Sequence, residues 1–429
     1  MRIVIVGAYG LLGGYVTARL LQEGHDLVGV GRDITAAARR FPRVNWVRAD
    51  LRRMASADWR PVLQDADAVV NCAGALQDGP RDDLDAVHRA SVSALAQACA
   101  AIGVRRFVQI SAAGVERGQG RFGSTKRQAD ETLEATALDW VILRPGLVLA
   151  PAAYGGSALL RGLAGFPGVI PALTPTSPVQ IISVDDVVEA VSRSLRPGAP
   201  SRIVCDLVAA EKTQLKDVLL ALRAWLGLPP APLATPPGWV GSLAAGAADG
   251  LAWLGWRSPL RTAAVAQAAA GVQGRSHDAE ALLGFVPLSL DDALGRWPSG
   301  VQERWYARLY FIKPLALGSL ALFWAVSGLI GLFNHAAAAR LLTDAGMDRR
   351  LAEGFVLAGG LTDLALGGLV CFRREAPLAL KGMILVTAAY LLGGSLWLPQ
   401  LWSDPLGPLV KSLPAAVLAM AALAMMDER

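Results

Sequence analysis

Four long apolar runs in the last third of this 429-residue chain constrain its fold more than any other feature. They cover residues 309–333, 355–372, 378–398 and 406–426. Each run is near the length that a helix needs to cross the hydrocarbon core of a bilayer. Four such runs in succession are hard to bury in a soluble domain. We therefore predict an all-α transmembrane four-helix domain over residues 305–429, with the lipid bilayer as its partner.

Basic residues near the ends of these runs predict the orientation of the domain. They flank the first run and fill the link between the second and third, at Arg304, Arg308, Lys313, Arg373 and Arg374. The loop around residue 403 has no Lys or Arg, whereas Arg340, Arg349 and Arg350 in the first outer loop count against this orientation. The start, MRIVIVGAYG, lacks a basic-then-apolar signal region. We expect a multi-pass protein of the inner (cytoplasmic) membrane whose N-terminal part lies in the cytoplasm.

The first 150 residues alternate short apolar strands with amphipathic helices, a pattern typical of a parallel sheet covered on both faces. Strands are expected at residues 3–6, 27–30, 45–48, 68–71, 107–110 and 140–143. Helices are expected at 11–23, 84–101 and 124–136. This order predicts the fold class: an α/β, doubly wound parallel-sheet Rossmann domain followed by the all-α membrane domain.

Three glycines follow the first strand and open the first helix, in the segment IVIVGAYGLLGG. Glycine allows a tight turn and a close backbone approach to a pyrophosphate, and the helix N-terminus offers free N–H groups to that anion. The predicted cofactor-binding residues of this segment are Gly7, Tyr9, Gly10, Leu11, Leu12 and Gly13.

Residues at the ends of the next strands predict which dinucleotide binds. Arg32 follows the second strand, where an acidic residue would hold the ribose diol of NAD, and an arginine favours the 2′-phosphate of NADP. Asp50, beside Leu51, ends the third strand and is expected to meet the adenine amino group. Small residues that let the cofactor pass end the fourth strand, at Cys72, Ala73 and Gly74. The predicted cofactor is NADP(H) in preference to NAD(H).

Together these segments resemble the extended or atypical branch of the short-chain dehydrogenase/reductase superfamily. The matching segments are GAYGLLG, ADL, NCAG, QISAAG, FGSTK, LRPGLVLAP and IISVDDVVEA, in the family's order within residues 1–297. Within that branch the chain is most similar to NmrA-like proteins and to the nucleotide-binding accessory subunit of respiratory complex I. The C-terminal region resembles the four-span DoxX-like membrane module, mainly in its hydropathy.

The resemblance implies roles for two residues and the loss of a third. The family has a tyrosine four residues before a lysine, on one helix face; the tyrosine exchanges the substrate proton, and the lysine lowers its pKa and holds the nicotinamide ribose. Ser111, which would orient the carbonyl, and Lys126 match this pattern and are the predicted catalytic and cofactor-binding residues, while Phe122 stands at the tyrosine position. Pro145 is a further predicted cofactor contact. Tyr154 is an alternative source of a phenol.

The domain boundaries before the membrane region are expected at 1–228 for the nucleotide-binding domain and 229–300 for a proline-flanked helical region. Two features in the chain, residues 239–271 and Asp363, allow alternative interpretations. Within the helical region, residues 239–271 fit either a lid over the substrate or an interfacial helix in lipid headgroups. Asp363, near the middle of the second apolar run, fits either a polar contact between helices or a proton or substrate site.

Composition excludes several function classes. The four cysteines are far apart with no CxxC pair, which argues against a disulfide framework or a zinc site, so no metal is expected. A net charge of +5 fits arginines near an anionic membrane, and no motif indicates nucleic-acid binding.

We predict a membrane-anchored NADP(H)-dependent oxidoreductase acting on a quinone or another lipophilic substrate. The alternative is a non-catalytic NADP(H)-binding redox sensor or a structural subunit with a membrane-protein partner; a homo-oligomer is also compatible. Nucleotide-sugar epimerisation is less favoured, because that chemistry generally depends on the missing tyrosine.

Overall fold

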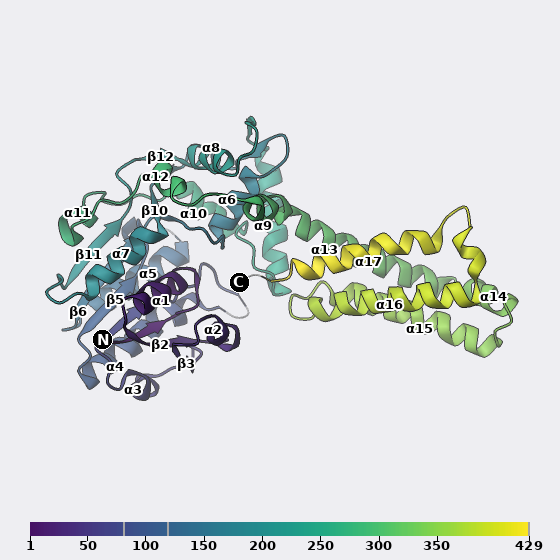
Figure 1. Cartoon of the computed structure of the whole chain (residues 1–429), viewed down its shortest axis with the longest axis horizontal. Coiled ribbons are helices and arrows are strands. Elements are labelled where there is room, and N and C mark those ends of the chain that lie inside the picture. The colour runs from purple at the N-terminus through teal and green to yellow at the C-terminus, as the bar shows by residue number, and fades with distance from the viewer. Residues whose placement is uncertain (80–81, 118–119, 428–429) are drawn as a thin grey trace. The chain divides into compact units, whose positions relative to one another are not determined.

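The computed structural model describes residues 1–79, 82–117 and 120–427 (Figure 1). The chain divides into two compact units. One unit consists of Met1–Asp249 and Ser258–Ala307, and the other of Gly250–Arg257 and Arg308–Arg429.

A seven-stranded parallel sheet forms the centre of the first unit. Its strands are β1 (Arg2–Val6), β2 (Asp26–Gly31), β3 (Asn45–Arg48), β4 (Ala68–Asn71), β5 (Arg106–Ile110), β6 (Asp139–Pro145) and β11 (Ile203–Leu207). The order is β11-β6-β5-β4-β1-β2-β3, so the direction of winding reverses between β1 and β4. Ligands of such sheets bind outside the carboxyl ends of the strands at this reversal. The predicted Rossmann fold is confirmed, and β11 is a seventh strand beyond the six expected.

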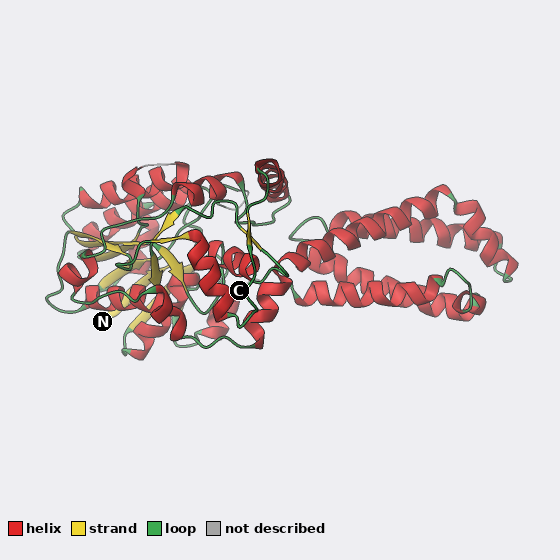
Figure 2. Ribbon diagram, turned by 90° about the horizontal axis from the view of Figure 1, so that it is seen from above, coloured by secondary structure: helices red, strands yellow, loops and turns green. Residues whose placement is uncertain are grey.

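Helices cover both faces of the sheet, as Figure 2 shows. On one face lie α1 (Leu11–Gln22), α7 (Val184–Leu195) and α11 (Asp278–Leu283). On the other lie α3 (Ser56–Leu63), α4 (Ser91–Ile102) and α5 (Gly120–Glu134). Strand β1 supplies both cores, because successive side chains point to opposite faces: Ile3 and Ile5 pack with the first group, and Val4 and Val6 with the second.

The remaining elements of this unit are short. The strands pair as β7 (Leu147–Leu149) with β10 (Ile181–Ser183), β8 (Ile170–Pro171) with β13 (Leu233–Ala234), and β9 (Pro178–Val179) with β12 (Thr213–Gln214). The helices are α2 (Thr35–Arg40), η1 (Asp85–Ala90), η2 (Val115–Arg117), α6 (Gly156–Ala164), α8 (Leu215–Trp225), α10 (Thr262–Ala270) and α12 (Leu290–Gly295). Helix α9 (Gly238–Trp253) leaves Trp239 and Trp253 exposed. Exposed tryptophans suit either the lid or the interfacial helix, and both interpretations stay predictions.

The second unit is helical. Its elements are α13 (Val301–Phe333), which begins in the first unit, α14 (His335–Asp344), α15 (Arg349–Leu369), α16 (Ala376–Trp397), η3 (Pro399–Trp402) and α17 (Pro408–Ala424). Three of them, α13, α15 and α16, are long and apolar enough to cross a membrane. The fourth predicted run forms α17, which has only 17 residues, so its crossing stays a prediction.

Candidate functional site

The turn between β1 and α1 has a backbone that only glycine fits. Gly7 has a φ of +74°, and a Cβ there would lie 3.0 Å from the Cα of Ala73. A Cβ on Gly13 would lie 2.1 Å from the carbonyl oxygen of Gly7. Gly10 precedes α1, no side chain caps this helix, and its first turn, with Leu11 and Leu12, holds no acidic residue. Backbone N–H groups at this helix end are therefore placed to donate hydrogen bonds to a pyrophosphate.

Tyr9 lies against the carboxyl end of the neighbouring strand. Its hydroxyl accepts a hydrogen bond from the backbone N–H of Asp33 at 3.1 Å. A Cβ on Gly31 would lie 2.1 Å from a ring carbon of Tyr9, so the ring needs glycine at the end of β2. Tyr9 thus joins the glycine turn to the start of the segment that carries Arg32.

Charged residues gather just beyond the carboxyl ends of β2 and β3. Arg32 donates to the carboxylate of Asp82 at 2.8 Å. The carboxylate of Asp50 pairs with the guanidinium of Arg52, which lowers the pKa of Asp50 to about 2; the charge of Arg32 contributes to this shift. Leu51 follows in the same turn. The structure therefore brings Arg32 and Asp50 to one edge of the sheet, and each has a protein partner there; their roles toward a cofactor stay predictions.

The segment after β4 is held in place by hydrogen bonds from its own strand and the strands beside it. The N–H of Cys72 donates to Val6 at 2.9 Å. Asn71 accepts the N–H of Ala73 at 3.1 Å and donates to Gln109 at 2.9 Å. Burial raises the pKa of the Cys72 thiol to about 12, so this side chain is neutral at physiological pH.

Lys126 is a buried lysine aimed at this segment. Its side chain is 5% exposed, and its Nζ donates to the carbonyl oxygen of Ile110 at 2.8 Å. The Nζ would lie 3.5 Å from a Cβ placed on Gly74, so the ammonium is directed at the end of β4. Burial lowers the pKa of Lys126 to about 8, against the opposing effect of nearby Asp130. The remaining N–H groups of Lys126 can serve a ligand at the switch point.

His88 lies near Lys126 and is a candidate site residue that the sequence did not indicate. It lies in η1, a π-helical turn, and is 1% exposed. Its Nε2 accepts the N–H of Ala75 at 3.1 Å, and its Nδ1 lies 2.9 Å from the hydroxyl of Thr125. Burial and then the charge of Lys126 lower the pKa of His88 to about 2. The ring is therefore neutral, with its proton on Nδ1, because Nε2 must accept.

Phe122 lies four residues before Lys126 on α5, which begins at Gly120 rather than at the expected residue 124. Its ring meets the edge of His88 in a T-shaped contact, with 5.6 Å between the ring centroids. Phe122 thus packs an apolar ring against His88, next to Lys126. Its equivalence to the family tyrosine stays a prediction.

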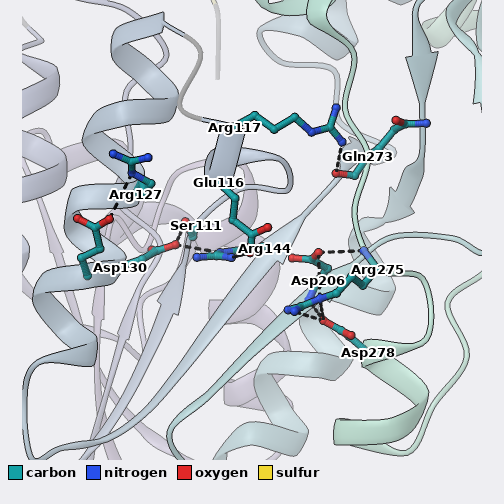
Figure 3. Close-up of polar contacts among 11 residues, drawn as sticks. Ser111, Glu116, Arg117, Arg127, Asp130, Arg144, Asp206, Gln273, Arg275 and Asp278 are labelled. Atoms are coloured by element: carbon teal, nitrogen blue, oxygen red, sulfur yellow. Dashed lines mark hydrogen bonds and ion pairs between the residues drawn. The ribbon is translucent and has the colours of Figure 1, made fainter.

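Ser111 points into a buried charge network, which Figure 3 shows. Its hydroxyl donates to Asp130 at 2.8 Å, and the same carboxylate oxygen accepts from Arg144 at 3.0 Å. Arg144 also pairs with Glu116. Burial raises the pKa of Asp130 to about 6, against the opposing effect of Arg144. The carbonyl-orienting role of Ser111 stays a prediction, since its hydroxyl here holds Asp130.

The last two candidates lie farther along the chain. Pro145 ends β6, and its carbonyl oxygen accepts the N–H of Ala113 at 2.9 Å, beside Ser111. Tyr154 precedes α6, and its N–H donates to Ser157 at 3.2 Å. Pro145 therefore lies at the same edge of the sheet as the other candidates. Tyr154 stays an alternative source of a phenol.

Comparison with known families covers both units. Residues 7–168 match the model of an NAD(P)H-binding family, and residues 321–420 match the model of the DoxX-like family. The chain joins an NAD(P)H-binding Rossmann domain to a DoxX-like domain. The resemblances inferred from the glycine turn and from the apolar runs are thus confirmed at this level.

Two curated relatives match part of this chain. An uncharacterized protein of Mycobacterium tuberculosis is 27% identical over 239 residues, which cover 55% of this chain and 24% of that protein. A ceramide reductase of Caulobacter vibrioides is 28% identical over 185 residues, which cover 43% of this chain and 57% of that enzyme. The match therefore spans about a quarter of the first relative and just over half of the second.

Solved structures share the fold of the first unit. UDP-glucuronic acid 4-epimerase from Bacillus cereus, solved with NAD, has a TM-score of 0.53 and 18% identity, and the match covers 73% of this chain and 99% of that one. The enzyme WbmG of Bordetella bronchiseptica, solved with NAD and UDP, has a TM-score of 0.54 and 17% identity over 72% of this chain and 96% of that one. At this identity the likeness shows the fold alone.

Proposed function

We propose that this protein is a membrane-anchored, NADP(H)-dependent oxidoreductase of the short-chain dehydrogenase/reductase superfamily that reduces a quinone or another lipophilic carbonyl compound. The observation that carries the proposal is the buried Lys126, whose Nζ faces Gly74 at the switch point of the sheet. A lysine buried there with spare N–H groups is better suited to a ligand than to stability, because burying an ammonium costs free energy.

The lipophilic substrate is inferred from two observations. Among the described residues, three helices are long and apolar enough to cross a membrane, which would hold the nucleotide site near lipid-soluble compounds. The Caulobacter vibrioides relative is a ceramide reductase, and ceramide is a lipid. Both support a substrate drawn from the bilayer.

Arg32 supports NADP(H) over NAD(H). Its guanidinium follows β2 and lies close enough to Asp50 to affect its pKa. A guanidinium there can bind the 2′-phosphate through charge-assisted hydrogen bonds. Without a nucleotide, the ion pair with Asp82 holds the Arg32 guanidinium at this position.

Lys126 is also the proposed proton donor. Bound NADPH would supply a hydride to the substrate carbonyl carbon, and the carbonyl oxygen then needs a proton. Phe122 cannot give one, and both ring nitrogens of His88 are engaged by Ala75 and Thr125. The Lys126 ammonium, with its lowered pKa, can transfer its proton to that oxygen and recover it from water.

The basic residues at the helix ends support an inner-membrane location with the nucleotide-binding domain in the cytoplasm. Arg373 and Arg374 follow α15 and precede α16, so the link between these helices carries positive charge. A protease added to spheroplasts, whose outer membrane is opened, should leave the nucleotide-binding domain uncut. Cleavage from outside would refute this orientation.

One observation favours the alternative, a non-catalytic NADP(H)-binding sensor or subunit. Phe122, which the resemblance puts at the tyrosine position, packs on His88 and carries no hydroxyl that could serve as the acid. In that case the nucleotide would stabilise a conformation or a complex.

The deciding experiment follows the absorbance of NADPH in detergent-purified protein after addition of a short-chain quinone or a long-chain ketone. We expect a decay that Lys126→Met abolishes while the fold persists. NADPH binding with a flat trace for both acceptors would favour the sensor. Phe122→Tyr should then be tested with the ketone, since activity in that variant alone would show an intact pocket whose native role does not use a tyrosine.

A further inference from the structure

Asp363 is a buried carboxylate inside the helices of the DoxX-like domain. It lies on α15, near the middle of the apolar run 355–372, and is 6% exposed. Its Oδ1 accepts from the hydroxyl of Tyr390 on α16 at 2.8 Å, and its Oδ2 accepts from the hydroxyl of Ser327 on α13 at 3.2 Å. The three helices that can cross a membrane therefore meet at one carboxylate.

Glycines bring these groups together. A Cβ on Gly359 would lie 2.9 Å from the Tyr390 hydroxyl. Glycine at this position therefore leaves room for the phenol to reach Asp363. A Cβ on Gly328 would lie 2.6 Å from the carbonyl oxygen of Gly360, so α13 and α15 pack backbone to backbone next to Ser327. Small residues allow this close helix packing in membranes. The local sequence is thus adapted to hold two hydroxyls on the carboxylate.

The partners of Asp363 suit both of its protonation states. A hydroxyl can donate to an ionised carboxylate and accept from a protonated one, whereas an ammonium, a guanidinium or an amide N–H only donates. Glu353 on the same helix instead pairs with Arg349 at 2.9 Å, which favours the ionised form alone. Within the described residues Asp363 makes no ion pair.

Other ionisable groups on the surrounding helices are bonded elsewhere or lie toward helix ends. They are Glu303, Arg304, Tyr306, Arg308, Tyr310 and Lys313 on α13, His335, Arg340 and Asp344 on α14, Arg349, Arg350 and Glu353 on α15, Lys381 on α16 and Lys411 on α17. Tyr390 is 43% exposed, so the phenol that hydrogen-bonds to Asp363 is not enclosed by the helices.

We propose that Asp363 is a reversible proton-binding site in the membrane domain, with Tyr390 and Ser327 as the hydroxyls that accommodate both the bound and the released state. One proton binds a carboxylate oxygen and leaves from it, and no other bond changes. The site does not depend on the activity of the nucleotide-binding domain.

The test uses the full chain in lipid vesicles and dicyclohexylcarbodiimide, an apolar reagent that adds to protonated carboxyl groups. The carboxyl O–H adds across one C=N bond of the reagent, and the acyl group then moves to nitrogen to give a stable acylurea. Peptide mass spectrometry reads the adduct at each pH. We expect labelling of Asp363 that falls tenfold per pH unit above a single midpoint, and no label at this position in Asp363→Asn.

Two further variants make the result specific. Tyr390→Phe removes a hydrogen bond to the ionised form and should move the midpoint up by about one to two pH units. Leu385→Ala, an exposed position on the same helix, should leave it unchanged. Labelling that is absent at every pH, or that is constant between pH 5 and pH 9, would overturn the proposal, provided that labelling of other carboxyl groups shows the reagent to be active.

Discussion

The Nζ of Lys126 donates to the carbonyl oxygen of Ile110 at 2.8 Å and so ties the middle of α5 to the end of β5. Strand β5 lies next to β4, and the segment with Gly74 follows β4. The amine of Lys126 is thus buried beside this segment, where we propose that the nicotinamide binds.

The first prediction concerns the pH dependence of NADPH oxidation. Burial lowers the pKa of Lys126 to about 8, so the ammonium is present below pH 8 and is lost as the pH rises through that value. If the ammonium donates the proton, kcat should fall about tenfold per pH unit above pH 8. Stopped-flow absorbance between pH 6 and pH 10 measures this decrease.

The control is Lys126→Arg, whose guanidinium stays charged throughout this range and is a poor proton donor. It should retain NADPH binding, measured by nucleotide fluorescence, with a low and pH-independent rate. An unchanged alkaline decrease in this variant would assign the titration to another group.

A second prediction concerns stability in acid. Burial lowers the pKa of His88 to about 2, well below the value of about 6.5 in an unfolded chain. The unfolded state therefore gains a proton first, so the contribution of neutral His88 to stability is complete above pH 6.5 and is lost as the pH falls below it. At pH 5 the loss is about 2 kcal/mol.

His88→Gln removes this titration and keeps an oxygen that can accept the N–H of Ala75. Calorimetry of the nucleotide-binding unit at pH 7 and pH 5 should show a smaller pH effect in this variant. His335→Gln, on α14 of the other unit, is the matched control. Equal pH effects in the wild type and His88→Gln would contradict the burial of a neutral ring.

A third prediction separates two adjacent glycines of α1. A Cβ on Gly13 would lie 2.1 Å from the carbonyl oxygen of Gly7, whereas a Cβ on Gly14 meets nothing within 4 Å. Gly13→Ala should destabilise the unit by about 1–3 kcal/mol and raise the Kd for NADPH at least tenfold. Gly14→Ala should be neutral or slightly stabilising. Isothermal titration and thermal unfolding measure both, and similar losses in the two variants would contradict this turn geometry.

The fourth prediction tests the choice of cofactor. Arg32→Asp should weaken NADPH binding by about ten- to hundredfold, because a charge-assisted contact to the 2′-phosphate is lost and a repulsive charge replaces it. NADH lacks that phosphate and should lose little affinity. Arg60→Asp, on α3, controls for the change in net charge. Equal losses for NADPH and NADH would refute the role of Arg32.

Local patterns allowed much of the fold to be predicted from the sequence. Gly7, Gly10 and Gly13 come directly after the first strand and at the start of the first helix, and this context indicated a pyrophosphate-binding turn; the family match confirmed an NAD(P)H-binding domain. The apolar runs indicated the helical domain because their lengths match a bilayer, and the DoxX-like match supports it. Strand β11 was missed, since only its pairing with β6 makes the segment Ile203–Leu207 a strand of the sheet.

The tertiary structure decided the contacts between residues that are distant in sequence. His88 meets Thr125, 37 residues later, and Ser111 gives its hydroxyl to Asp130 rather than to the cofactor side. Asp363 acquires Tyr390 and Ser327 from two other helices. The sequence by itself determined which segments are strands, turns and membrane-length helices, because hydrophobic periodicity and glycine turns act over short stretches of chain. Only the packing of those segments decided which polar groups are buried together, and burial sets their pKa values and their chemistry.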